Sequence, residues 1–226
     1  MPDITFFQES LISALRPIND PEYIDTLHNE ASQCTRCPIH VHMGKCPLYR
    51  GNVLAPIAIV SEKSGPAEAK VGYPLAGGSG YKIEELFKEA GIPEPFWDYV
   101  KATNIVICHI PDNERSHSQR EIKNCKWWEA FLDAYPPKLI LALGKLAVKE
   151  LSGIKRPFTM GKVNGKTFRY KGIRCIATYN PAYLLRLQSA GHTDLYEKAI
   201  LPWKNTIKAG TRRVLSQQVG TASILH

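Results

Sequence analysis

A short apolar run, Pro56-Ile-Ala-Ile-Val60, leads directly into the polar, glycine-rich segment SEKSGPAEAKVGYPLAGGSG at residues 61–80. Such a run is typical of a strand that is buried on both faces, with the polar segment following its carboxyl end. Three similar runs lie downstream, at residues 103–107, 138–143 and 172–178. Helical patterns are found at residues 81–90, 118–134, 144–151 and 193–208. Buried strands that alternate with helices predict a three-layer α/β/α sandwich with a central, mostly parallel four-stranded sheet.

This fold class predicts where a ligand binds and how the chain is divided. Ligands of such sheets bind beyond the carboxyl ends of the strands, so residues 61–80 and the segments after Asn104 and Thr178 are expected at one rim. The length of 226 residues suits one domain with extensions. We predict a single domain over residues 1–209, starting with a helical extension at 1–33, and a flexible tail at 210–226. Asn164-Gly165 is typical of a β-hairpin turn.

The charge of the chain favours a polyanionic partner. Lys and Arg number 29 against 21 Asp and Glu, which gives a formal net charge of +8. Nucleic acid is the commonest polyanion inside cells, although a merely soluble basic protein would have the same composition. No apolar run reaches the ~18 residues of a membrane span, and the first ten residues lack the features of a secretory signal. We therefore expect a cytoplasmic protein that works away from membranes and has nucleic acid as its partner.

The six cysteines indicate a metal site, because disulfides are rare inside cells. Cys34 and Cys37 form a Cys-x2-Cys pair, and Cys108 and Cys125 follow far downstream. Soft thiolates bind zinc or iron–sulfur clusters, and the spacing does not separate these two alternatives. Cys108 and Cys125 would also suit ordinary small buried positions. Cys46 either replaces one of the four thiols or is a spare.

Several motifs occur in the same order as in the iron–sulfur (family 4) uracil-DNA glycosylases, and the chain resembles this family from about Cys34 to Arg186. Within residues 61–80, the positions in register are Glu62, Gly65, Glu68, Gly72, Pro74, Gly77 and Gly80. The matching segments downstream are Thr103-Asn-Ile-Val-Ile-Cys108, Glu121-Ile-Lys-Asn-Cys125, Leu143-Gly-Lys-Leu-Ala147 and Asn180-Pro-Ala-Tyr-Leu-Leu-Arg186. The resemblance implies a [4Fe–4S] cluster, with zinc as the alternative, bound by Cys34, Cys37, Cys108 and Cys125.

The resemblance also implies a DNA glycosylase that flips uracil or a related altered pyrimidine out of the DNA and hydrolyses its N-glycosidic bond. We expect it to be a monomer, with DNA and a replication or repair protein as its partners. Glu62 would orient water and offset positive charge on the sugar, and its register with the motif favours this role over that of a solvated loop acid. Asn104 offers a donor and an acceptor to the edge of the base, but asparagine is also common as a loop cap. The remaining residues of the base pocket would be Ser64, Gly65, Leu75 and, as a second catalytic residue, Asn180.

A DNA-contacting segment is implied by the last of these motifs. Leu184 and Leu185 would fill the gap that the flipped base leaves, and Arg186 would lie near a phosphate. Leucines at helical spacing are, however, equally typical of a core.

Three departures from the family bear on activity. The active-site His of the family is Asn180 here, the Phe that stacks on the base is Leu75, and Ser61 and Ser64 replace a Gly and a Pro. A neutral amide is a weaker donor than the family's His, and leucine has no aromatic face, so slow or redirected catalysis is expected. The alternative function is a DNA-binding module of the same fold, weak or inactive as a glycosylase, that assists replication or binds modified bases.

Overall fold

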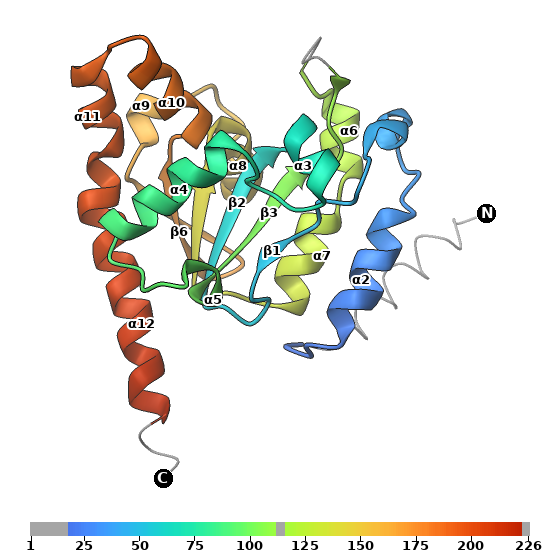
Figure 1. Cartoon of the computed structure of the whole chain (residues 1–226), viewed down its shortest axis with the longest axis horizontal. Coiled ribbons are helices and arrows are strands. Elements are labelled where there is room, and N and C mark those ends of the chain that lie inside the picture. Colours follow the sequence, from blue (N-terminus) through green and yellow to red (C-terminus); the bar gives the residue numbers. More distant parts are fainter. Residues whose placement is uncertain (1–17, 112–115, 223–226) are drawn as a thin grey trace.

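The computed structural model describes residues 18–111 and 116–222. A six-stranded sheet in the order β1-β3-β2-β4-β6-β5 forms its centre, with helices on both faces (Figure 1). The four inner strands are parallel and contain the four apolar runs: β2 (Ile57–Lys63), β3 (Val100–Val106), β4 (Leu139–Leu143) and β6 (Ile173–Thr178). The predicted α/β/α class is confirmed.

The sheet has two edge strands more than predicted. β1 (Arg50–Gly51) pairs antiparallel with β3, and β5 (Thr167–Tyr170) pairs antiparallel with β6. The β5–β6 turn lies at Lys171-Gly172, where both residues have positive φ, as a two-residue hairpin turn requires. The prediction of a hairpin turn at Asn164-Gly165 was wrong, because helix α9 (Met160–Val163) precedes these residues instead of a strand.

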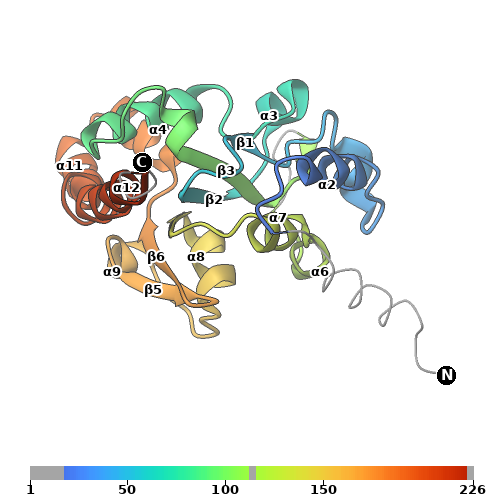
Figure 2. The same ribbon diagram turned by 90° about the horizontal axis from the view of Figure 1, so that it is seen from below.

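Alternate residues of the inner strands pack into two separate cores. Ile57 and Ile59 of β2 belong to one core, whereas Ala58 and Val60 belong to the other. The first core lies under α4 (Gly78–Glu89), α10 (Pro181–Ser189), α11 (Thr193–Pro202) and α12 (Lys208–Ala222). The second lies under α2 (Tyr23–Ser32), α7 (Trp127–Ala134) and α8 (Lys145–Ser152). Figure 2 shows these helix layers on the two sides of the sheet. Burial on both faces explains why the strands read as continuous apolar runs.

The remaining elements are short and connect these layers. They are the 3₁₀ helix Pro38–His42, α3 (Pro66–Val71), α5 (Phe96–Tyr99), α6 (Gln119–Asn124) and the π-helical turn Trp203–Ile207. The helix predicted at 118–134 is therefore two helices, α6 and α7, with Cys125 at the end of the first. In the part of the chain that the structure describes, no helix is both long enough and apolar enough to cross a membrane.

Helix α12 corrects the prediction of a flexible tail from residue 210. The Thr211 side chain is buried and its hydroxyl donates to the carbonyl of Ala90 at 3.2 Å, and Val214 packs in the core under α11. The domain therefore continues through this helix instead of ending at residue 209. The sequence pattern missed it because only a few apolar positions of α12 face the core. Residues 1–17 and 223–226, which belong to the predicted extension and tail, lie outside the described residues.

The parallel register brings the carboxyl ends of the strands to one edge of the sheet. Ser61 of β2 lies opposite Asn104 of β3, and Leu143 of β4 lies opposite Thr178 of β6. Glu62 and Gly144 follow these positions directly, and Asn180 comes two residues after Thr178, so residues from four strand ends share one rim, as expected.

Candidate active site

A pocket of about 600 Å³ opens at this rim. Seven residues predicted from the sequence line it: Glu62, Ser64, Gly65, Leu75, Asn104, Asn180 and Arg186. The structure therefore brings together segments that lie more than a hundred positions apart in the sequence.

The Glu62 carboxylate is fixed at the start of helix α8. The backbone N–H of Leu146 donates to Glu62 Oε1 at 2.8 Å, and the positive end of the helix dipole favours a negative charge there. Gly144 makes this position accessible: its φ is +90°, and a Cβ atom on it would lie 2.6 Å from Glu62 Oε2. Glu62 is thus a positioned carboxylate and not a solvated loop acid.

Asn180 links Glu62 to helix α10. Its Oδ1 accepts from the backbone N–H of Ala182 at 3.0 Å, which is the geometry of an N-cap. Its Nδ2 lies 3.4 Å from Glu62 Oε2 and 3.5 Å from Ser61 Oγ. The amide donor therefore points toward the carboxylate, and the two side chains lie together in the pocket.

Asn104 is held by a side chain of the neighbouring loop. Its Nδ2 donates to Ser64 Oγ at 2.8 Å, and the side chains are almost fully buried, with 1% and 2% of the two residues exposed. The backbone N–H of Ser64 in turn donates to the carbonyl of Val106. A buried amide with a fixed orientation presents its polar atoms to a ligand in one arrangement, which suits recognition of a base edge.

All six thiols lie in or against one core, and five of them, all except that of Cys175, take part in the electrostatics around Cys108. Cys37, Cys46, Cys108 and Cys125 are buried in that core, and Cys34 packs against it. Burial raises the pKa of the Cys108 thiol, and the proximity of Cys125, Cys37, Cys34 and Cys46 raises it further. Burial likewise raises the pKa of Cys125 to about 11, and Cys34 and Cys37 contribute to that increase.

These thiols do not form a compact metal-ligating group in the part of the chain that the structure describes. Within the described residues, no three His, Cys, Asp or Glu side chains form a group that could hold one metal ion. The thiols are nevertheless close enough to raise one another's pKa, so they lie near one another in the core.

Comparison with known proteins agrees with this geometry. The family model of the uracil DNA glycosylase superfamily matches residues 48–204, which is more than half of the chain. The chain belongs to the uracil-DNA glycosylase superfamily. The match includes β2, the pocket and the helix that follows Asn180.

Three relatives of this superfamily are similar over most of their length, and each is named a Type-4 uracil-DNA glycosylase. The protein from Thermotoga maritima is 29% identical over 169 residues, covering 74% of this chain and 86% of the relative. The one from Pyrobaculum aerophilum is 29% identical over 171 residues, covering 72% and 85%. The one from Archaeoglobus fulgidus is 28% identical over 171 residues, covering 73% and 84%.

Of the two leucines predicted to contact DNA, only one is partly exposed. Leu184 is fully buried and packs in the core with α4 and α11, so its prediction as a DNA contact was wrong. Leu185 is partly exposed, and its Cδ1 faces Gly78 at the start of α4. Arg186 is exposed and lines the pocket. The prediction of a DNA contact is therefore limited to Leu185 and Arg186.

Arg50, on the short edge strand β1, was not predicted but supports the pocket. Its Nη1 donates to the carbonyl of Leu75 at 2.8 Å, and its Nη2 pairs with Glu84 Oε1 at 2.8 Å. The guanidinium carbon also lies 3.9 Å from the ring centre of Trp97, whose Nε1 donates to the same oxygen of Glu84. Leu75 has φ +55°, an unusual conformation for a leucine, and Arg50 holds its carbonyl in place. A single arginine belongs to no motif with a recognisable spacing, so the sequence alone could not reveal this role.

Replacing Arg50 by Lys is expected to destabilise the protein and slow its reaction. An ammonium group cannot bond Leu75 and Glu84 and also stack on Trp97, since lysine lacks the planar fork of arginine. We expect unfolding to be about 1–3 kcal/mol easier, and activity to fall about tenfold as the Leu75 loop relaxes. Denaturant titration and excision rates measure both effects, with Arg120→Lys on the exposed face of α6 as the control. Unchanged values for Arg50→Lys would show that the loop keeps its shape without this clamp.

Proposed function

We propose that this protein is a DNA glycosylase that removes uracil from DNA by hydrolysing its N-glycosidic bond. The observation that carries the proposal is the placement of an anchored carboxylate, Glu62, beside a buried, oriented amide, Asn104, in one pocket. The name uracil-DNA glycosylase, given to relatives that this chain covers for most of their length, supports the same activity.

The reaction breaks the bond between the sugar and the base, and the residues of the pocket match its charges. The base leaves with the bonding electrons while positive charge develops on the sugar, and the oxygen of water then bonds to the sugar carbon. A negatively charged Glu62 would offset the positive charge, and its remaining lone pairs would orient the water. Asn104 would read the uracil edge, and the Nδ2 of Asn180 would donate to the departing base, as a weaker donor than a histidine.

For the metal centre, we propose a [4Fe–4S] cluster bound by Cys34, Cys37, Cys108 and Cys125. A zinc ion brings four ligands to about 2.3 Å from one point, whereas a cluster is bound through several separate irons and accepts a wider ring of thiols. The four thiols lie in or against one core and near enough to one another to raise the pKa of Cys108, which supports a centre that they share. When bound, the cluster would link three segments: the loop that carries Cys34 and Cys37, the chain just after β3 and the end of α6.

Anaerobically purified protein is expected to be brown, with iron and sulfide in equal amounts. Cys108→Ser should lose most of the iron, because it removes a ligand of the cluster. The matched control is Cys175→Ser, which changes another buried thiol, in strand β6, that belongs to no ligand set. A colourless, folded protein with stoichiometric zinc would contradict the proposal. If Cys108→Ser retains its iron while Cys46→Ser loses it, Cys46 is a ligand in place of Cys108.

Binding to DNA is expected to depend strongly on salt and on the presence of uracil. A net charge of +8 and contacts to phosphates imply release of counterions, so affinity should fall steeply as salt is raised. Fluorescence anisotropy with a duplex carrying one uracil, and with the matching thymine duplex, measures both dependences. An affinity that is independent of salt, or absent at low salt, would contradict a role on DNA.

A further inference from the structure

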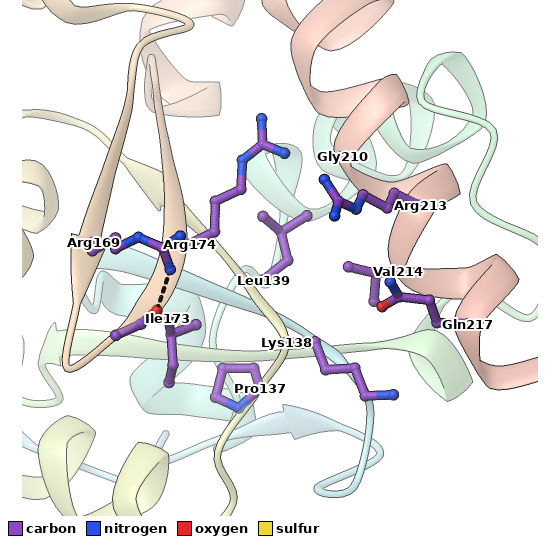
Figure 3. A pocket seen from close by; sticks show the side chains of 11 residues that line it. Pro137, Lys138, Leu139, Arg169, Ile173, Arg174, Gly210, Arg213, Val214 and Gln217 are labelled. Atoms are coloured by element: carbon purple, nitrogen blue, oxygen red, sulfur yellow. Dashed lines mark hydrogen bonds between the residues drawn. The ribbon is translucent and has the colours of Figure 1, made fainter. Parts of the chain in front are cut away.

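A second pocket, of about 430 Å³, lies at the opposite edge of the sheet from the candidate active site (Figure 3). Leu139 and Ile173, which line it, are the first residues of β4 and β6, whereas the candidate active site follows the carboxyl ends of the strands. Helix α12 forms the facing wall through Gly210, Arg213 and Val214. A ligand in this pocket would therefore not compete with DNA in the active site.

Four cationic side chains line the pocket without a neutralising partner. They are Lys138, Arg169, Arg174 and Arg213, and no carboxylate is among the lining residues. None of the four forms an ion pair within residues 18–111 and 116–222, whereas surface lysines nearby do: Lys171 pairs with Asp133 and Lys204 pairs with Glu197. In Figure 3 the guanidinium groups of Arg174 and Arg213 extend into the space between the β5–β6 hairpin and α12. Repelling cations gathered around one concavity favour an anionic ligand.

The floor of the pocket is aliphatic. Leu139 and Val214 are buried beneath it, and Ile173 is half-buried at its side. Gly210 allows α12 to approach this closely, since a Cβ atom on it would lie 3.4 Å from Leu139 Cδ2 and 3.1 Å from Ile176 Cδ1. No aromatic ring is among the lining residues, so the pocket offers no platform on which a nucleic acid base could stack.

We propose that this pocket binds a short acidic segment of a partner protein. One aliphatic side chain of the segment would rest on Leu139 and Val214, and its flanking carboxylates would pair with Arg174, Arg213 and Arg169. Arginine forks suit carboxylates because they can form two parallel hydrogen bonds. The Nη1 of Arg169 already donates to the carbonyl of Gly172 at 2.6 Å, which orients its side chain beside the pocket. The proposal does not depend on glycosylase activity.

Fluorescence anisotropy with a labelled acidic peptide tests the proposal on the full-length, iron-loaded protein. The probe is a peptide of Asp and Glu residues around one central leucine. We expect Arg174→Ala and Arg213→Ala each to weaken binding about tenfold, through the loss of a charge-assisted hydrogen bond. The matched control is Arg212→Ala, which removes the same charge from the position of α12 just before Arg213 but does not line the pocket. Its effect should be less than about twofold.

Two further probes define the outcomes that would overturn the proposal. Replacing the central leucine of the peptide by serine should weaken binding, because the aliphatic floor would lose its partner. If an oligothymidine of equal charge binds in an Arg213-dependent manner while the peptide does not, the pocket is a nucleic acid site. If Arg212→Ala weakens binding as much as Arg213→Ala, the peptide responds to the overall positive charge of the protein and not to this pocket. Circular dichroism melting of each variant shows that the fold is intact, and Glu62→Gln should bind the peptide like the unaltered protein.

Discussion

Replacing Glu62 by Gln is expected to lower the rate of uracil excision by about 10²–10⁴-fold. The amide keeps the shape of the side chain and an oxygen that can accept from the Leu146 N–H, but it removes the negative charge that opposes the charge on the sugar. Single-turnover cleavage of a duplex with one uracil measures the rate. The control, Glu89→Gln on the exposed side of α4, removes the same charge away from the pocket.

The affinity of Glu62→Gln for the same duplex separates two explanations of a lower rate. We expect binding to be preserved or slightly tighter, because the loss of a negative charge favours phosphate contact. If the variant cleaves at the rate of the unaltered protein, Glu62 only ties β2 to the start of α8, and the catalytic carboxylate must be sought elsewhere.

Replacing Gly144 by Ala is expected to reduce both stability and activity. The backbone at this position has φ +90°, which alanine adopts only with strain of about 1–3 kcal/mol. The new methyl group would also overlap the carboxyl group of Glu62, which must then move. Since displacement of a catalytic group by about 1 Å can cost on the order of 10²-fold in rate, we expect a loss of that size.

A second glycine of the same helix separates strain from displacement. Gly153 ends α8 with φ +67°, and a Cβ atom on it would meet nothing within 4 Å. Gly153→Ala should therefore destabilise the protein through strain while excision stays close to normal. Denaturant titration and single-turnover rates compare the two variants. Equal rates in both would show that the Glu62 carboxylate tolerates being moved, and that its anchored position is not required.

The inner strands could be predicted because burial on both faces produces continuous apolar runs. The edge strands could not, since β1 has two residues and β5 alternates between exposed and half-buried positions. The pocket residues followed from motifs placed at strand ends, which a parallel sheet brings to one rim. The helical period places Leu184 and Arg186 on opposite sides of α10, but the pattern could not show which of the two leucines, Leu184 or Leu185, turns inward. The close approach of Gly144 to Glu62 requires three-dimensional coordinates.

Release of free uracil is the measurement that tests the central claim most directly. The iron-loaded protein is incubated with a duplex containing one uracil, and mass spectrometry quantifies both the free base and the abasic strand. We predict that uracil and abasic sites appear in equal amounts, and that the matching thymine duplex stays intact. If the protein binds the uracil duplex but neither uracil nor abasic sites appear, it is a DNA-binding module with a glycosylase fold and not an enzyme.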